Sequence, residues 1–135
     1  MRYDIGTIAD LCREIGLRCV VESPDVVDIS LEEDVVLRFE NLDGSDDCMV
    51  SFAGSNWHAH GDLGFCDHRG YNVDLDYLSV ITGISDGTIL VCEQWKRGAL
   101  ADRWLVHREY VDEFRFLEDG EEIRIRPVVP SGAST

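Results

Sequence analysis

Apolar residues recur at helical spacing in the first segment of the chain, at Ile5, Ile8, Leu11, Cys12 and Ile15. This period predicts an amphipathic helix whose apolar stripe faces a core. Thr7-x-x-Asp10 resembles a capping box, and Gly16 is suited to end the helix. The stripe therefore indicates packing and not a cofactor site.

The pattern then changes to a period of two, which is typical of strands. Four strands are predicted, at 17–22, 26–29, 35–40 and 48–53. Pro24 separates the first two because proline has no N–H for a strand ladder. The segment Asn41-Leu42-Asp43-Gly44-Ser45 is a turn signal, so the fourth strand is expected to return antiparallel beside the third.

The second half of the sequence predicts further elements of both kinds. Asp74 is expected to cap a helix that directs Leu75, Leu78 and Ile81 inward and ends near Gly83. Residues 88–95 and 102–108 are predicted to form a hairpin joined through Lys96-Arg97-Gly98. A short helix that starts near Tyr110 and ends at Gly120 is predicted next. A last strand follows, with Ile123 and Ile125 inside and Arg124 and Arg126 outside.

Together these elements predict an α+β fold, with a largely antiparallel sheet of about six strands and two or three helices. The chain has 135 residues, the size of one ordinary domain, and no internal repeat or linker divides it. We expect a single domain over residues 1–129. Residues 130–135 are expected to form a disordered tail because they include no large apolar side chain.

The chain is strongly acidic, with 12 Lys and Arg against 27 Asp and Glu and a formal charge of −15. Such a charge repels nucleic-acid phosphates and anionic lipid, which disfavours direct binding to either. Residues 22–47 hold ten carboxylates against the single Arg38. This concentration indicates either a solvated acidic surface or a landing surface for a basic partner.

Composition also leads to an expectation about location. No apolar run approaches the roughly 18 residues of a membrane span, and the N-terminal residues lack a signal-peptide core, so a cytoplasmic protein is expected. The five cysteines form no Cys-x-x-Cys pair, and their odd number argues against a complete disulfide framework. They are predicted to be reduced thiols that mostly fill the core.

Three of the four histidines, His58, His60 and His68, fall within residues 58–68. On a strand, His58 and His60 would share a face, and with Asp62 they could bind zinc as part of a small metal-dependent hydrolase. Cys66 or His68 could complete such a ligand set. Against a metal site, the sequence has no His-Glu-x-x-His motif and no second separated ligand motif.

The same residues also fit a site that needs no cofactor. Trp57 offers an apolar ring with one hydrogen-bond donor, and the neighbouring imidazoles can make directed hydrogen bonds, as in an interface hot spot. A third interpretation is structural: the histidine pair hydrogen-bonds at a sheet edge while Trp57 packs over the core. The chain would then be a structural or adaptor domain.

The segment Val50-Ser51-Phe52-Ala53-Gly54-Ser55-Asn56-Trp57-His58-Ala59-His60 precedes a predicted helix and a Trp-containing hairpin. Over residues 48–108 this arrangement resembles small immunity proteins of bacterial polymorphic-toxin and contact-dependent systems. The resemblance implies a small acidic α+β protein that binds and blocks one toxin, and it assigns no individual contact residue.

The leading hypothesis is therefore a cytoplasmic protein inhibitor of a basic toxin, a binding protein in preference to an enzyme. An acidic inhibitor would associate faster with a basic toxin and cover its phosphate-binding surface. Asp43, Asp46 and Asp47 are predicted to steer association, while Trp57, His58 and His60 are predicted to supply contact specificity. The zinc hydrolase and the adaptor domain are the alternatives.

Overall fold

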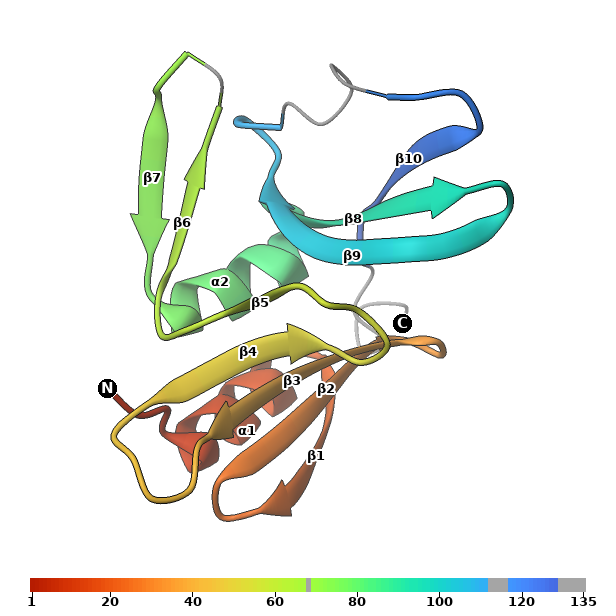
Figure 1. The fold of residues 1–135 in the computed structure, drawn as a ribbon. Coiled ribbons are helices and arrows are strands. Elements are labelled where there is room, and N and C mark those ends of the chain that lie inside the picture. The colour runs from red at the N-terminus through yellow and green to blue at the C-terminus, as the bar shows by residue number, and fades with distance from the viewer. Residues whose placement is uncertain (68, 112–116, 129–135) are drawn as a thin grey trace.

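The computed structural model describes residues 1–67, 69–111 and 117–128, and it shows an α+β fold. The described residues form two helices and ten strands, and every strand pairing is antiparallel. The strands build a five-stranded, a three-stranded and a two-stranded sheet (Figure 1). The predicted fold class is confirmed, although the strands outnumber the predicted ones.

Helix α1 spans Ile5–Ile15 and ends at Gly16, which has the left-handed φ of 81°. The expected apolar stripe is confirmed, because Ile5, Ile8 and Cys12 are buried. The predicted capping box at Thr7 is wrong. Asp4 caps the helix by accepting a hydrogen bond from the Thr7 backbone N–H at 3.0 Å, so the helix begins at Ile5, before the predicted cap.

The five-stranded sheet follows chain order. Its strands are β1 (Arg18–Ser23), β2 (Val26–Glu32), β3 (Val35–Asn41), β4 (Cys48–Phe52) and β5 (His58–Ala59). Helix α1 packs against β1 and β2 on one face (Figure 1). Alternate residues of β2, β3 and β4 are buried on the inner face, and these are Val27, Ile29, Leu31, Val35, Leu37, Phe39, Cys48, Val50 and Phe52.

The three-stranded sheet places β8 (Ile89–Lys96) between β10 (Glu121–Arg126) and β9 (Ala99–His107). The predicted hairpin of β8 and β9 is confirmed, and Arg97 and Gly98 form its two-residue turn with φ of 52° and 82°. Positive φ at both positions is the requirement of a type I′ turn. In β10, Arg124 is exposed as predicted, whereas Arg126 is half-buried.

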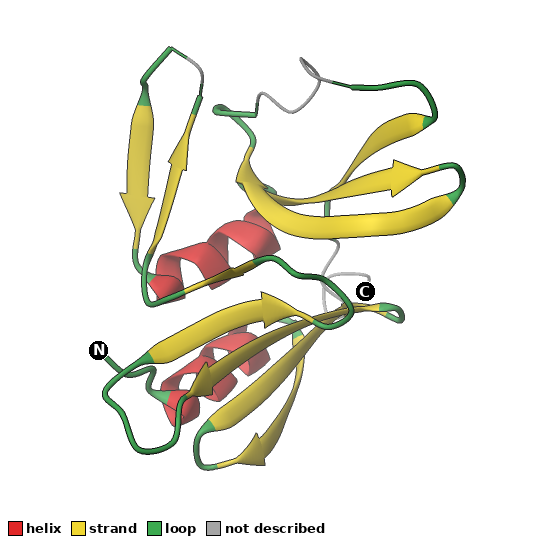
Figure 2. Cartoon of the chain, viewed as in Figure 1, coloured by secondary structure: helices red, strands yellow, loops and turns green. Residues whose placement is uncertain are grey.

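Helix α2 spans Tyr77–Asp86 and packs against α1 and β8 (Figure 2). Its cap is Asp76, whose side chain accepts from the Ser79 backbone N–H, and it ends at Gly87. The predicted cap at Asp74 is wrong because Asp74 belongs to a strand. No helix in the described part of the chain is long and apolar enough to cross a membrane.

The segment between His60 and α2 was expected to be a loop, and it contains a hairpin. Strands β6 (Leu63–Cys66) and β7 (Asn72–Leu75) form the two-stranded sheet. Each strand has four residues, too few for a clear alternation in the sequence. The middle of the helix predicted from Tyr110 to Gly120, residues 112–116, lies outside the described residues, and the described residues on either side of it are not helical. The tail predicted over 130–135 also lies outside the described residues.

One apolar cluster joins the sheets and both helices. It extends from Tyr3 and Ile8 through the five-stranded sheet to Ile81, Ile84 and Ile89, and on to Leu105 and Val128. Gly83 permits close contact between α2 and β8, because a Cβ at this position would lie 2.6 Å from the Ile89 Cγ1. Between β4 and β6, Trp57 and Ala59 pack against this core, whereas His58 and His60 are exposed.

Candidate functional site

The turn between β3 and β4 projects three exposed carboxylates, Asp43, Asp46 and Asp47. We call residues 42–47 the acidic turn. Asp46 has 88% of its side chain exposed, and Asp43 has no hydrogen-bond or ion-pair partner among the described residues. The predicted steering residues therefore lie together on the surface, as their sequence spacing requires.

The first two residues of the chain hold the acidic turn. The Met1 ammonium group donates to the Asp46 carbonyl oxygen at 2.8 Å. The Arg2 guanidinium donates to the Ser45 carbonyl oxygen at 2.9 Å and to the Asp25 carboxylate at 2.8 Å. The contacts to the two carbonyl oxygens hold the backbone of the turn in place. The Arg2–Asp25 ion pair is partly exposed and adds little stability by itself.

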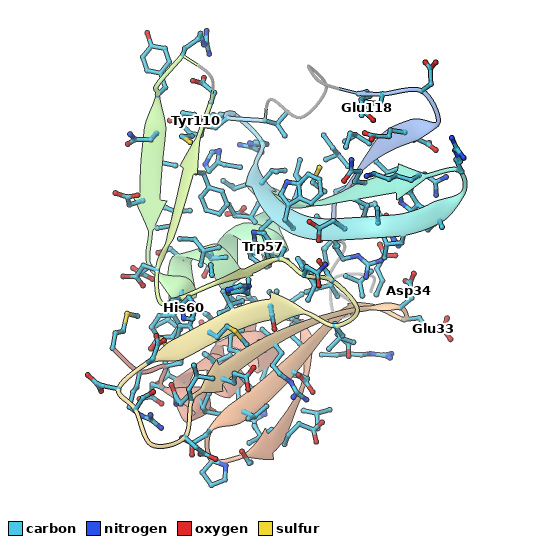
Figure 3. The ribbon with its side chains drawn as sticks, viewed as in Figure 1. Glu33, Asp34, Trp57, His60, Tyr110 and Glu118 are labelled. Carbon is cyan, nitrogen blue, oxygen red and sulfur yellow. The ribbon has the colours of Figure 1, made fainter. Side chains whose placement is uncertain are left out.

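His60 lies against the last residue of the acidic turn. Its Nδ1 is 3.2 Å from the Asp47 carboxylate and 3.0 Å from the Cys48 carbonyl oxygen. The His58 ring stands nearly perpendicular to the His60 ring, with 5.3 Å between the centroids. The prediction that the two histidines share a face is confirmed. Asp47 contacts His60, which is labelled in Figure 3, although the two residues are 13 positions apart in the sequence.

The hydrogen bonds fix which ring nitrogen carries the proton. Carbonyl and carboxylate oxygens only accept, so the Nδ1 of His60 donates to Cys48 and Asp47. The His58 Nδ1 likewise lies 3.2 Å from the Asn56 carbonyl oxygen and donates to it. In the neutral rings Nε2 is then left as an acceptor, and in the protonated rings it becomes a donor. The Nε2 atoms of His58 and His60 can therefore each form a further hydrogen bond.

Trp57 is half-buried and packs on Phe52, with 5.7 Å between ring centroids. Its backbone N–H donates to the Ser55 hydroxyl, which also accepts from the Arg103 N–H and donates to the Asp102 carboxylate. Ser55 thus ties the segment before β5 to β9. Trp57 therefore packs against the core, as the structural interpretation of this residue predicted.

The zinc interpretation requires His58, His60 and Asp62 to converge. Asp62 instead accepts a hydrogen bond from the Tyr77 backbone N–H at 3.2 Å, at the start of α2. In residues 1–67, 69–111 and 117–128, no three His, Cys, Asp or Glu side chains group as metal ligands. His68 lies outside the described residues. The two imidazoles thus lack a third ligand in this part of the chain.

Sequence reasoning missed a buried group of charges in the three-stranded sheet. Glu93 is fully buried, and its carboxylate accepts from the Arg103 guanidinium at 2.8 Å and 2.6 Å. Arg126 also donates to it at 3.0 Å and pairs with Glu32. We call Glu93, Arg103 and Arg126 the Glu93 cluster. The signal was present, because Glu93 continues the inward period of Ile89 and Val91.

The five cysteines form no disulfide in the part of the chain that the structure describes. Cys12, Cys48 and Cys92 are buried, Cys19 is half-buried and Cys66 is exposed, so the prediction that they mostly fill the core is confirmed. Burial raises the pKa of the Cys12 thiol to about 12, with a further contribution from the adjacent Cys19. A thiol of this kind stays protonated and unreactive at neutral pH.

Comparison with protein-family models, curated proteins and solved structures gives no significant match to this chain. Functional assignment therefore depends on the geometry and charge of the residues themselves.

Proposed function

We propose that this protein is a binding protein of the immunity type, which captures a basic toxin through the acidic turn and the histidine pair. The observation that carries the proposal is the contact of Asp47 with His60 beside His58, because it places charge and directed hydrogen-bond groups on one surface. Such a surface suits a protein ligand, since it offers several polar contacts without a deep cavity.

The net charge of −15 supports an electrostatic role. An acidic surface attracts a basic partner over several ångströms and raises the association rate, whereas the close contacts determine the dissociation rate. In this proposal Asp43 and Asp46 act mainly on association. His58 and His60 act mainly on the lifetime of the complex.

The test pairs the chain with the protein encoded beside its gene, because an immunity gene is expected next to its toxin gene. Co-expression of the two proteins is expected to restore growth of cells that the second protein inhibits. Rescue that depends on a purified, stoichiometric complex supports the proposal. Absence of a complex between the two purified proteins counts against it.

Two charge variants separate local steering from total charge. The triple variant D43N/D46N/D47N removes the acidic turn's charge, and E14Q/E33Q/E118Q removes the same charge from exposed positions elsewhere. The first is expected to slow association about tenfold in low salt and the second much less, with the difference disappearing near 0.5 M salt. Equal association rates for both variants would contradict steering by this turn.

The double variant H58A/H60A tests the contact residues. It is expected to raise the dissociation rate about tenfold or more, as for hot-spot residues, with little change in association. Both rings are exposed enough for the protein to remain folded, which circular dichroism would verify. A complex with unchanged lifetime would place the interface elsewhere on the molecule.

A further inference from the structure

Two strand edges face a common cleft on the side of the molecule away from the acidic turn. Among the described residues β6 pairs only with β7, and β9 pairs only with β8 (Figure 1). An open cleft of about 180 Å³ lies between them. Consecutive residues of both strands line it, together with one residue that follows β9, and these are Gly64, Phe65, Cys66, Leu105, Val106, His107 and Tyr110.

On the β6 side, hydrogen-bond alternation shows which backbone groups face the cleft. The Asp67 N–H donates to the Tyr71 carbonyl oxygen, so this pair is hydrogen-bonded. Hydrogen-bonded pairs recur at every second residue of an antiparallel ladder. Phe65 therefore bonds toward β7, whereas the N–H and C=O groups of Gly64 and Cys66 point away from β7 and into the cleft.

The same reasoning applies to β9. The Arg108 N–H donates to the Thr88 carbonyl oxygen, so Val106 bonds toward β8 while Leu105 and His107 point outward. Arg103 also points outward by this count, and its outward N–H is taken by the Ser55 hydroxyl. The hydrogen bond from the Arg103 N–H to Ser55 thus agrees with the outward direction that the register gives to Arg103.

Among the described residues, the outward N–H groups near the cleft have no such partner. In the part of the chain that the structure describes, no backbone hydrogen bond joins Gly64 or Cys66 to Leu105 or His107. The His107 carbonyl oxygen alone is used, by the Tyr110 N–H. Leu105 and His107 are 4% and 8% exposed, which is unusual for strand residues whose edge is unpaired.

Side chains close one face of the cleft. Phe65 and His107 lie with ring centroids 6.1 Å apart, and Leu105 is on the same face of β9 as His107. All three are buried, so they form an apolar floor with one imidazole. A ligand in the cleft would lie on this floor while its edges meet the backbone groups of both strands.

A carboxylate lies on the opposite face. Gly64 has no side chain, and the Asp74 carboxylate covers this position so closely that a Cβ there would lie 2.9 Å from it. Asp74 is exposed and has no cationic partner among residues 1–67, 69–111 and 117–128. The exposed face of the cleft therefore favours a basic side chain.

We propose that an extended segment of a partner protein inserts between β6 and β9 as an additional strand. Only an extended polypeptide presents donors and acceptors on both edges at the spacing of a strand. Its side chains would alternate between an apolar residue on the Phe65, Leu105 and His107 floor and a Lys or Arg facing Asp74. This site is separate from the acidic turn, and its occupancy does not depend on the proposed immunity role.

Proline substitutions on the two strands of the hairpin test the proposal directly. Cys66 and Asn72 are opposite each other in β6 and β7, and both are exposed. Both N–H groups point out of the hairpin, so C66P and N72P remove no bond of the ladder between them. C66P removes a donor at the cleft, whereas N72P removes a donor at the far edge and is the matched control.

The probe is a displayed library of peptides about nine residues long, with Lys or Arg at alternate positions and apolar residues varied between them. Enriched peptides are expected to bind the wild-type chain and N72P equally and to lose about tenfold or more in affinity for C66P. Their binding is also expected to weaken in D74N. No enrichment over a library screened without the protein would overturn the proposal, as would equal binding to C66P.

Hydrogen exchange gives a readout that does not depend on the variants. In the free protein the amides of Gly64, Cys66, Leu105 and His107 are expected to exchange rapidly, while those of Phe65 and Val106 are protected. A bound peptide is expected to slow the first set about tenfold or more. Protection in the free protein would overturn the proposal, and protection that rises with protein concentration would identify a second copy as the occupant instead.

Discussion

The five-stranded and three-stranded sheets are both antiparallel, but different interactions stabilise them. The inner face of the five-stranded sheet is apolar, with Val27, Ile29, Leu37 and Phe39 fully buried. The three-stranded sheet buries Glu93 completely, with Arg103 and Arg126 around it. Apolar contacts tolerate small changes of shape, whereas a buried carboxylate needs its donors at fixed positions.

This difference affects how each sheet specifies its register. A slip of one residue in β8 would leave Glu93 without Arg103 and expose an unpaired charge to the core. The Glu93 cluster also crosses between sheets, because Arg126 of β10 pairs with Glu32 of β2. The cluster is thus suited to fix how β10 and β8 meet the five-stranded sheet.

The largest effect is expected from Glu93→Gln, which keeps the shape of the side chain and removes its charge. It should lower the free energy of unfolding by about 3–5 kcal/mol, because the buried Arg103 guanidinium loses its anion and the half-buried Arg126 loses one of its two carboxylate partners. Urea denaturation measures this change. Glu122→Gln is the control, since Glu122 pairs with Arg124 at the exposed surface and its loss should change stability much less. Similar values for both variants would show that burial of the Glu93 carboxylate gives it no special role in the three-stranded sheet.

In the apolar sheet, Leu37→Ala is expected to cost about 2–5 kcal/mol because Leu37 is fully buried and its loss leaves a cavity. Leu37→Met conserves volume and should cost less than about 1.5 kcal/mol. The same denaturation experiment compares the two. If Leu37→Met were as harmful as Glu93→Gln, the apolar sheet would be no more tolerant than the charged one.

The junction between α2 and β8 gives a smaller effect. Gly83→Ala should lower stability by about 1–3 kcal/mol, since its Cβ would lie 2.6 Å from Ile89. Gly6→Ala in α1 is the matched helical control, because the nearest atom to its Cβ is Asp4 Oδ1 at 3.7 Å. This control should gain about 0.5–1 kcal/mol. Thermal unfolding of both variants checks the opposite signs, and a stabilising Gly83→Ala would contradict the close packing.

The smallest effect concerns the turn of the β8–β9 hairpin. Arg97 has a φ of 52°, a conformation that asparagine adopts more easily than arginine. Arg97→Asn is therefore expected to raise stability by about 1 kcal/mol. Arg97→Ala removes the same charge without relieving the backbone strain, so it should give no comparable gain. Equal gains from both would assign the effect to charge.

Much of the fold could be predicted because its signals are local. The stripe of α1, the alternation of β3 and the turn at Asn41–Ser45 each depend on neighbouring residues. The hairpin of β6 and β7 was missed because four-residue strands with glycine and aspartate show little period. The predicted N-terminal caps of both helices were also wrong, since several nearby residues can cap and tertiary contacts choose between them.

In the candidate site too, local features could be predicted from the sequence and contacts between separate elements could not. The shared face of His58 and His60 depended on a two-residue spacing, and it could be predicted. The contact of Asp47 with His60 and the attachment of Asp62 to the start of α2 depend on how separate elements pack. The cleft between β6 and β9 also depends on tertiary structure, because neither strand's sequence shows which of its edges is left unpaired.

The Ser55 hydroxyl lies between the two proposed binding surfaces and is hydrogen-bonded toward both. It accepts from Trp57 at the start of the histidine segment and from Arg103, two residues before Leu105 at the cleft. A strand inserted beside β9 would thus act on the segment that positions His58. By thermodynamic linkage, any help that one ligand gives the other is returned by the same factor, so both affinities would report one coupling free energy.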